Sequence, residues 1–180
     1  MKTLRFLLVP ALLLSAAGCK KEKDAEPTKT ALLTAKTWRE SSSTLVVNGA
    51  EGVQNTPTAN ASTWKFSTDN KVTVTKPNNT TSTGTWALAE NDTKITLTLN
   101  GQTQTQQIFT LDANNFSAGF SFTQAQVQAA INGQSVPGVP NGLITLILLS
   151  AGGFTFPAGT PAINANQITS LQLRTNLVAQ

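Results

Sequence analysis

The chain has 180 residues, of which 39% are hydrophobic and 12% charged, with a formal net charge of +4. This length and composition predict one folded domain and exclude a chain that is disordered throughout. The absence of histidine excludes Ser-His-Asp and Cys-His catalysis and histidine-ligated zinc, so we expect no enzyme. The small charge lacks the concentrated basic face that nucleic acid requires, and no nucleic-acid partner is expected.

The first 18 residues have the features of a secretion signal. Residues 1–5 carry two positive charges, residues 6–14 are apolar apart from Pro10, and residues 15–18 are small. The apolar run is too short to span a bilayer as a helix. We therefore expect residues 1–18 to be a signal peptide that is removed.

Cys19 follows this segment directly and is the only cysteine. A single cysteine in an exported protein has no partner for an intrachain disulfide. The sequence Ala16-Ala17-Gly18-Cys19 resembles the lipobox of bacterial lipoproteins, in which the thiol receives a diacylglycerol and the chain is cut before the cysteine. The resemblance implies lipid attachment at Cys19 and a membrane anchor. The alternative is a chance cysteine in an ordinary signal peptide.

Residues 19–30 are rich in charge, contain Pro27 and show no apolar periodicity. They are predicted to be a flexible tether. Their mixed charges partly resemble the signals that send some lipoproteins to the outer-membrane surface, and a plain solvated linker is the alternative. We expect a lipid-anchored protein of the outer membrane, on its periplasmic or cell-surface face.

Residues 31–180 are predicted to form the folded domain. One helical turn is expected at residues 30–35 and a first strand at residues 36–47. A bulge is expected in the serine run of that strand, because the apolar positions change sides there. Asn48-Gly49 predicts a tight turn, and the polar residues 50–61 are expected to form a loop.

Residues 62–99 have the pattern of four short strands joined by three tight turns. In each strand every second residue is apolar, and Asn, Asp or Pro marks each turn. This is the signature of a half-buried antiparallel sheet. The side chains expected to face inward are Trp64, Phe66, Val72, Val74, Trp86, Leu88, Ile95 and Leu97.

The alternation continues beyond this stretch. Asn100-Gly101 predicts a two-residue hairpin turn, with strands over residues 102–111 and 115–122. The second of these strands has four inward-facing positions of one parity, which are Phe116, Ala118, Phe120 and Phe122.

The regular pattern then breaks at an expected insertion of about residues 123–159. Thr123 with Gln126 forms a capping-box pattern that predicts a helix. Periodicity alone does not separate a buried helix from a buried strand in the apolar run that follows. The expected elements are a helix over 124–132, a loop over 135–142, a helix or strand over 143–149, a short strand over 153–157 and a closing strand over 168–178.

Charge is nearly absent from the last third of the chain, where Arg174 is the only charged side chain after Asp112. One interpretation is that this region is covered, or meets an apolar ligand, a partner or lipid. The other is that Asn, Gln, Ser and Thr supply solubility in place of charge.

Several of these segments together resemble the lipocalin-like domains of small Gram-negative lipoproteins. The resemblance is carried by residues 32–38, which end in Trp38, by residues 64–72 with their Phe66-x-x-Asp69 hairpin, by Gly84-Thr85-Trp86 and by residues 91–97. It implies an all-β fold: an antiparallel up-and-down barrel of about eight strands, either packed inside or holding one small ligand. It implies no enzymatic residues.

The candidate ligand-binding residues are the aromatic side chains that the pattern turns inward. They are Trp38, Trp64, Trp86, Phe116 and Phe120. The alternative is that these rings simply fill the barrel. The carboxylates Asp69, Glu90, Asp92 and Asp112 all fall in predicted turns, where they bind local backbone, and no metal or cofactor is expected.

Two functional hypotheses follow. The first is a lipid-anchored envelope protein whose barrel binds a small apolar ligand. The second is a non-enzymatic structural lipoprotein with a filled core, which contacts an envelope protein partner through an outer face or through the insertion.

Overall fold

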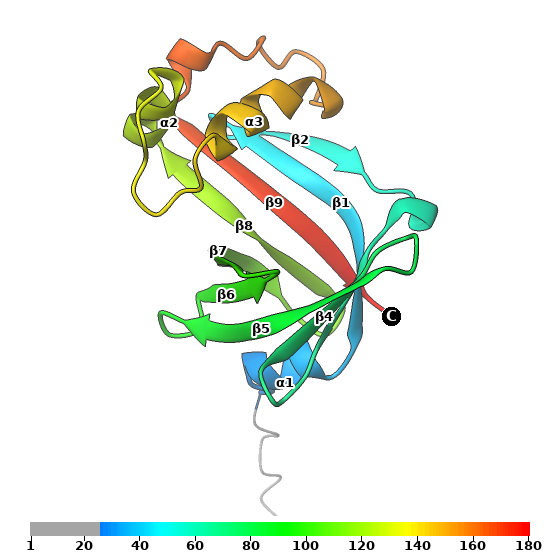
Figure 1. Cartoon of the computed structure of the whole chain (residues 1–180). Coiled ribbons are helices and arrows are strands. Elements are labelled where there is room, and N and C mark those ends of the chain that lie inside the picture. Colours follow the sequence, from blue (N-terminus) through cyan, green and yellow to red (C-terminus); the bar gives the residue numbers. More distant parts are fainter. Residues whose placement is uncertain (1–25) are drawn as a thin grey trace, which may run out of the picture.

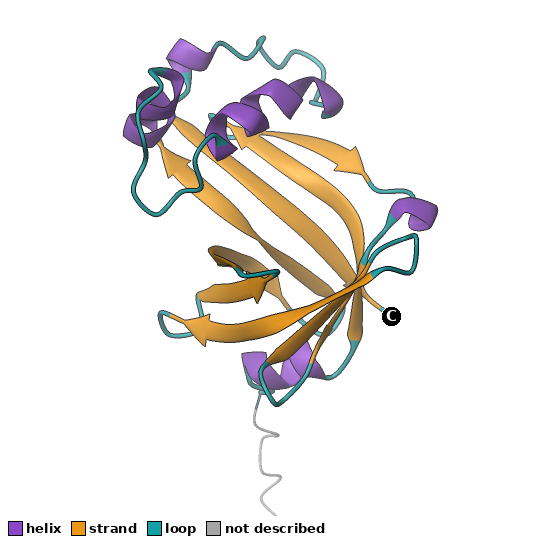
Figure 2. Cartoon of the chain, in the orientation of Figure 1, coloured by secondary structure: helices purple, strands orange, loops and turns teal. Residues whose placement is uncertain are grey.

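The computed structural model describes residues 26–180, which form nine strands and three α-helices with short 3₁₀ turns (Figures 1 and 2). The helices are α1 (Lys29–Thr34), α2 (Gln124–Ile131) and α3 (Leu143–Ser150). The strands are β1 (Thr37–Val47), β2 (Ala50–Asn55), β3 (Thr63–Phe66), β4 (Lys71–Thr75), β5 (Thr81–Ala89), β6 (Lys94–Leu99), β7 (Gln102–Leu111), β8 (Asn115–Thr123) and β9 (Ser170–Ala179). The expected signal peptide, Cys19 and most of the tether lie outside the described residues.

Eight of these strands close into an antiparallel barrel. Each strand from β3 to β9 pairs with the next, and β1 pairs with both β3 and β9. The ninth strand, β2, stands outside this ring and pairs with β1. The fold class expected from the sequence, a lipocalin-like barrel of about eight strands, is therefore confirmed.

β1 changes its neighbour part-way along its length. Residues 37–39 pair with β3, and residues 42–47 pair with β2 instead. The register against β9 shifts between Glu40 and Ser42, which is the bulge predicted for the serine run. The junction that closes the barrel between β1 and β3 is therefore three residue pairs long.

β2 corrects the prediction of a loop over residues 50–61. The Asn48-Gly49 turn has positive φ at both residues and returns the chain along β1, as a type I′ hairpin does. The inward position of β2 is Gly52, and the ring of Phe156 lies where its Cβ would be. The strand therefore has no apolar side chain of its own at that position, and its sequence lacks the usual alternation.

Two hydrophobic cores lie along the same long strands. The barrel core consists of Leu33, Trp38, Phe66, Val72, Val74, Trp86, Ile95, Leu97, Phe116, Ala118 and Leu177. The second core, the helical-layer core, consists of Leu45, Val47, Phe122, Val127, Val136, Ile144, Ile147, Ile168 and Leu171. β1, β8 and β9 contribute to both, because they run beyond the barrel and carry α2 and α3 at their far ends (Figure 1).

In the segment that covers those ends, the structure decides between the helix and the strand that were left open for residues 143–149, and it differs from the prediction in two ways. Residues 143–150 are helical, with Ile144 and Ile147 buried one turn apart. The short strand expected at residues 153–157 is reduced to one bridge, between Thr155 and Val53. The insertion ends at residue 169, later than expected, because Thr123 pairs with Ser170 across β8 and β9.

No helix within residues 26–180 is both long and apolar enough to cross a membrane.

Candidate functional site

Trp38 and Trp86 are part of the packed wall of the barrel. Trp38 is completely buried, and its indole Nε1 donates a hydrogen bond to the backbone oxygen of Leu33 at 2.9 Å. The Nε1 of Trp86 donates to the backbone oxygen of Ser67 at 3.1 Å. Neither ring is among the side chains that line the interior cavity of the barrel. The structure therefore places these two candidates in the core, as the filled-barrel alternative supposes.

Trp64 is the half-buried tryptophan, and it sits against the interior cavity. Its Nε1 donates to Glu40 Oε1 at 2.9 Å, and Glu40 Oε2 accepts the backbone N–H of Ser62 at 3.4 Å. The ring stacks on Phe66 with centroids 6.4 Å apart. Glu40 holds the polar edge of the indole, so that the apolar face of the ring is left to form the cavity wall.

The interior cavity has a volume of about 80 Å³. Its lining combines an aromatic and aliphatic floor with two uncharged polar side chains. These residues are Trp64, Phe66, Leu97, Phe116, Ala118 and Leu177, with Gln106 and Thr175. Drug-sized ligands occupy sites of roughly 300–1,000 Å³, so this cavity is too small to enclose one completely.

The two candidate phenylalanines of β8 belong to different cores. Phe116 lines the cavity and packs edge-on against Trp38 and Phe66. Phe120 lies four residues further along β8, packs against the helical-layer core and stacks on Phe122. The alternation of residues along β8 correctly predicted that both rings face inward. It carried no information on where β8 leaves the barrel.

This eight-stranded ring with an aromatic interior has a counterpart among known families. Residues 34–118 match the family model of the lipocalin-like domain. No curated protein and no solved structure matches the chain. The match runs from the end of α1 into β8, so the helical layer and β9 lie beyond it. Lipocalin-like barrels are a ligand-binding architecture.

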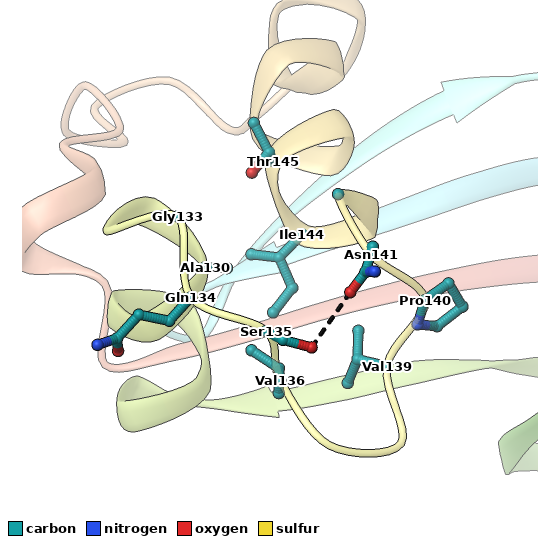
Figure 3. A pocket seen from close by; sticks show the side chains of 11 residues that line it. Ala130, Gly133, Gln134, Ser135, Val136, Val139, Pro140, Asn141, Ile144 and Thr145 are labelled. Atoms are coloured by element: carbon teal, nitrogen blue, oxygen red, sulfur yellow. Dashed lines mark hydrogen bonds between the residues drawn. The ribbon is translucent and has the colours of Figure 1, made fainter.

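The helical layer contains hollows of its own, outside the residues that match the lipocalin-like family model. One of them lies between α2 and the start of α3 (Figure 3). It has a volume of about 280 Å³. Val136 and Ile144 form its floor, and Ser135 Oγ donates to Asn141 Oδ1 at 3.2 Å across the loop. The close-up shows Asn141 and Ser135 directed toward each other, which fixes the two ends of the loop.

A larger hollow lies between the end of α3 and the segment 154–165. Its volume is about 560 Å³, and a neighbouring hollow of about 290 Å³ is lined in part by the same segment. Sequence reasoning missed both, because most of their lining is Ala, Gly, Pro and isolated Phe, which show no periodicity. The only signal was the lack of charge.

The turn carboxylates act locally in this lipocalin-like domain. The backbone N–H groups of Asn114 and Asn115 hold the pKa of Asp112 below its ordinary value. The hydrogen bond from Lys71 likewise lowers the pKa of Asp69. Glu90 forms an ion pair with Lys94 at 2.7 Å. Residues 26–180 contain no group of three acidic, histidine or cysteine side chains that could hold a metal ion.

Proposed function

We propose that this protein is a lipid-anchored envelope lipoprotein whose lipocalin-like barrel binds a small apolar ligand at its mouth. The observation that carries the proposal is the aromatic lining of the interior cavity, with Trp64 half-buried beside it. The cavity is small, so the ligand is held partly inside, with its apolar part on Trp64 and Phe116. Gln106 and Thr175 supply uncharged hydrogen-bonding groups at the same place.

The anchor is supported by the sequence alone. Cys19 stands at the end of a charged, apolar and small-residue series of the kind that directs export. Two or three acyl chains at this position hold a protein on a membrane stably, where one chain does not. α1 begins ten residues further on, at Lys29, so the domain stands close to its attachment point.

The proposal is tested with N-phenyl-1-naphthylamine, an uncharged dye that fluoresces in apolar surroundings. Residues 26–180 contain all nine strands and both hydrophobic cores, so they form a self-contained domain for the titration. We expect saturable uptake of the dye. Gln106→Phe, which fills the mouth, should weaken the uptake that changes the emission of Trp64 at least tenfold.

Gln107→Phe is the matched control, because Gln107 faces outward on the same strand, opposite Lys94. This variant should bind the dye as the wild type does. Equal binding by the two variants, with both folded by circular dichroism, would show that the barrel mouth is not the site.

A second candidate function is interaction with an envelope protein, and α3 favours it. Leu146 is 63% and Leu149 78% exposed on the outer side of this helix. Exposed apolar residues that cluster on one face are typical of contact surfaces. The comparison of Gln106→Phe with Gln107→Phe separates the two functions, because neither variant changes the uptake of the dye if the barrel is filled and the protein acts through α3.

A further inference from the structure

A hollow of the size of a small-molecule site lies outside the barrel, beside α3. At about 560 Å³ it falls within the roughly 300–1,000 Å³ typical of small-molecule sites, whereas the barrel cavity of about 80 Å³ does not. α3 provides one wall through Leu148, and the segment 154–165 provides the other. The hollow therefore has the volume of a small-molecule site. It lies on a part of the chain that the match to the lipocalin-like family model does not cover.

The side chains that line this hollow are apolar apart from one hydroxyl group, and backbone groups supply the rest of its polar surface. Thr160 supplies that hydroxyl, which already donates to the backbone oxygen of Pro157 at 2.8 Å. The remaining lining residues are Leu148, Ala151, Gly152, Phe154, Phe156, Pro157, Pro161, Ala162, Ile163 and Ala165. Two phenylalanine rings and two proline rings offer flat surfaces, which suit a ligand that itself contains rings.

No charge is available to a ligand here. Arg174 is the only charged side chain after Asp112. Its Nη1 lies 3.2 Å from Glu51 Oε1, its Nη2 donates to Gln172 at 2.6 Å, and its guanidinium lies 4.5 Å from the ring centre of Phe109. A ligand with a carboxylate or sulfonate would therefore lose hydration without gaining an ion pair.

The outer wall is held to the sheet at few points. Phe156 packs on the bare backbone of Gly52, and Thr155 exchanges two backbone hydrogen bonds with Val53, at 3.0 and 2.9 Å. Beyond Phe156, the segment borders two hollows, and Thr160, Pro161, Ala162 and Ile163 line both. Part of the apolar surface of this segment therefore has no protein packed against it.

We propose that the hollow between α3 and residues 154–165 is a second binding site, which takes an uncharged, ring-containing apolar molecule. This goes beyond the function proposed for the barrel and does not depend on it. Apolar contacts drive binding at this site. Anions bind more weakly, because the site has no positively charged side chain to compensate for their lost hydration.

The test compares two dyes with the same aromatic skeleton. N-phenyl-1-naphthylamine is uncharged, and 8-anilino-1-naphthalenesulfonate adds one sulfonate. The measurement is made on residues 26–180 with Gln106→Phe, in which the barrel mouth is filled, and this domain should bind the uncharged dye at least tenfold more tightly than the sulfonated one. Ala162→Phe, which fills the hollow, should remove this binding, whereas Ala158→Phe should not, because Ala158 lies in the same segment without lining the hollow.

A second variant guards against misfolding of Ala162→Phe. Ile163→Ser removes an exposed side chain from the rim and should weaken the uncharged dye severalfold while the domain keeps its melting temperature. Gln106→Phe should leave this site intact, so failure of the barrel site and failure of this site are distinguishable. The inference is overturned if the two alanine variants bind alike, or if the sulfonated dye binds as tightly as the neutral one.

Discussion

Asp112 shows how a single carboxylate sets a turn in this protein. Its Oδ1 accepts the backbone N–H groups of Asn114 at 2.7 Å and Asn115 at 2.8 Å, which holds the chain between β7 and β8 in its reversal. The backbone N–H of Asn114 is the largest cause of the lowered pKa of Asp112. Sequence reasoning assigned this role to the turn acids from residue type alone.

The charge of Asp112 predicts a pH dependence of stability. Its pKa in the folded state lies below the ordinary value of 3.8, so the stabilisation is complete above that pH and disappears as the pH falls through the lower folded value. Asp112→Asn should therefore have a lower urea midpoint than the wild type at pH 7, and the difference should vanish at pH 2. Asn115→Ala, which keeps the carboxylate, should retain the pH dependence. A difference that persists unchanged in acid would contradict this account.

At the scale of the element, α2 is the helix whose first residue the sequence predicts most clearly. Thr123 is the last residue of β8 and also the N-cap of α2. The backbone N–H of Gln126 donates to Thr123 Oγ1 at 3.4 Å, and the backbone N–H of Thr123 donates to Gln126 Oε1 at 2.9 Å. This reciprocal pair turns a strand into a helix within one residue and directs Val127 into the helical-layer core.

Loss of this cap is predicted to destabilise the domain measurably. Thr123→Ala should lower the free energy of unfolding by about 1 kcal/mol, because a helix N–H loses its acceptor. Gln124→Ala changes an exposed residue outside the cap and should have an effect within about 0.5 kcal/mol. Urea unfolding followed by circular dichroism measures both. A cost for Thr123→Ala as small as that of the control would show that the box contributes little.

The elements that the sequence predicted are those that bury their own side chains. β3 to β6 and β8 alternate clearly because each supplies apolar side chains to its inward face, and the capping box is local. β2 was missed because Phe156, far away in the chain, fills the inward place above Gly52. The helical form of α3 was left open because Leu and Ile stand at nearly every position. At the candidate site, strand parity turned all these rings inward, but only the folded barrel shows that Trp64 and Phe116 line the interior cavity and that Trp38 and Trp86 do not.

At the scale of the whole molecule, different elements cover the two ends of the barrel. α1 and the turn that contains Ala113 lie at one end, where Lys36 Nζ donates to the Ala113 oxygen at 2.9 Å. α2 and α3 lie at the opposite end (Figure 1). The ten residues from Cys19 to Thr28 reach about 35 Å at most, which is about the length of the 11-residue strand β1 alone. With Cys19 lipidated as proposed, α3 should point away from the bilayer.

This orientation is measurable by energy transfer to a dye in the membrane. In vesicles that carry the lipidated chain, a fluorophore on Ala113→Cys should transfer energy more efficiently than one on Leu149→Cys. Both positions are exposed, so labelling should not disturb the fold. The wild-type chain is the control for the anchor, because a lipidated Cys19 leaves no thiol for a maleimide. Equal transfer from both positions would contradict the orientation, and labelling of the wild type would contradict the anchor.

The direct pairing of Thr123 with Ser170 has one more consequence. β8 and β9 form a single β-hairpin, and the entire stretch 124–169 is its loop. The two strands pair in one unbroken register, from Thr123 and Ser170 to Asn115 and Val178. Each doubling of such a loop adds only about 0.6 kcal/mol of closure entropy. The pairing of β8 with β9 therefore sets little limit on the length of this segment. A replacement must still cover Leu45, Val47, Phe122 and Leu171, which the helical-layer core buries at the ends of the strands.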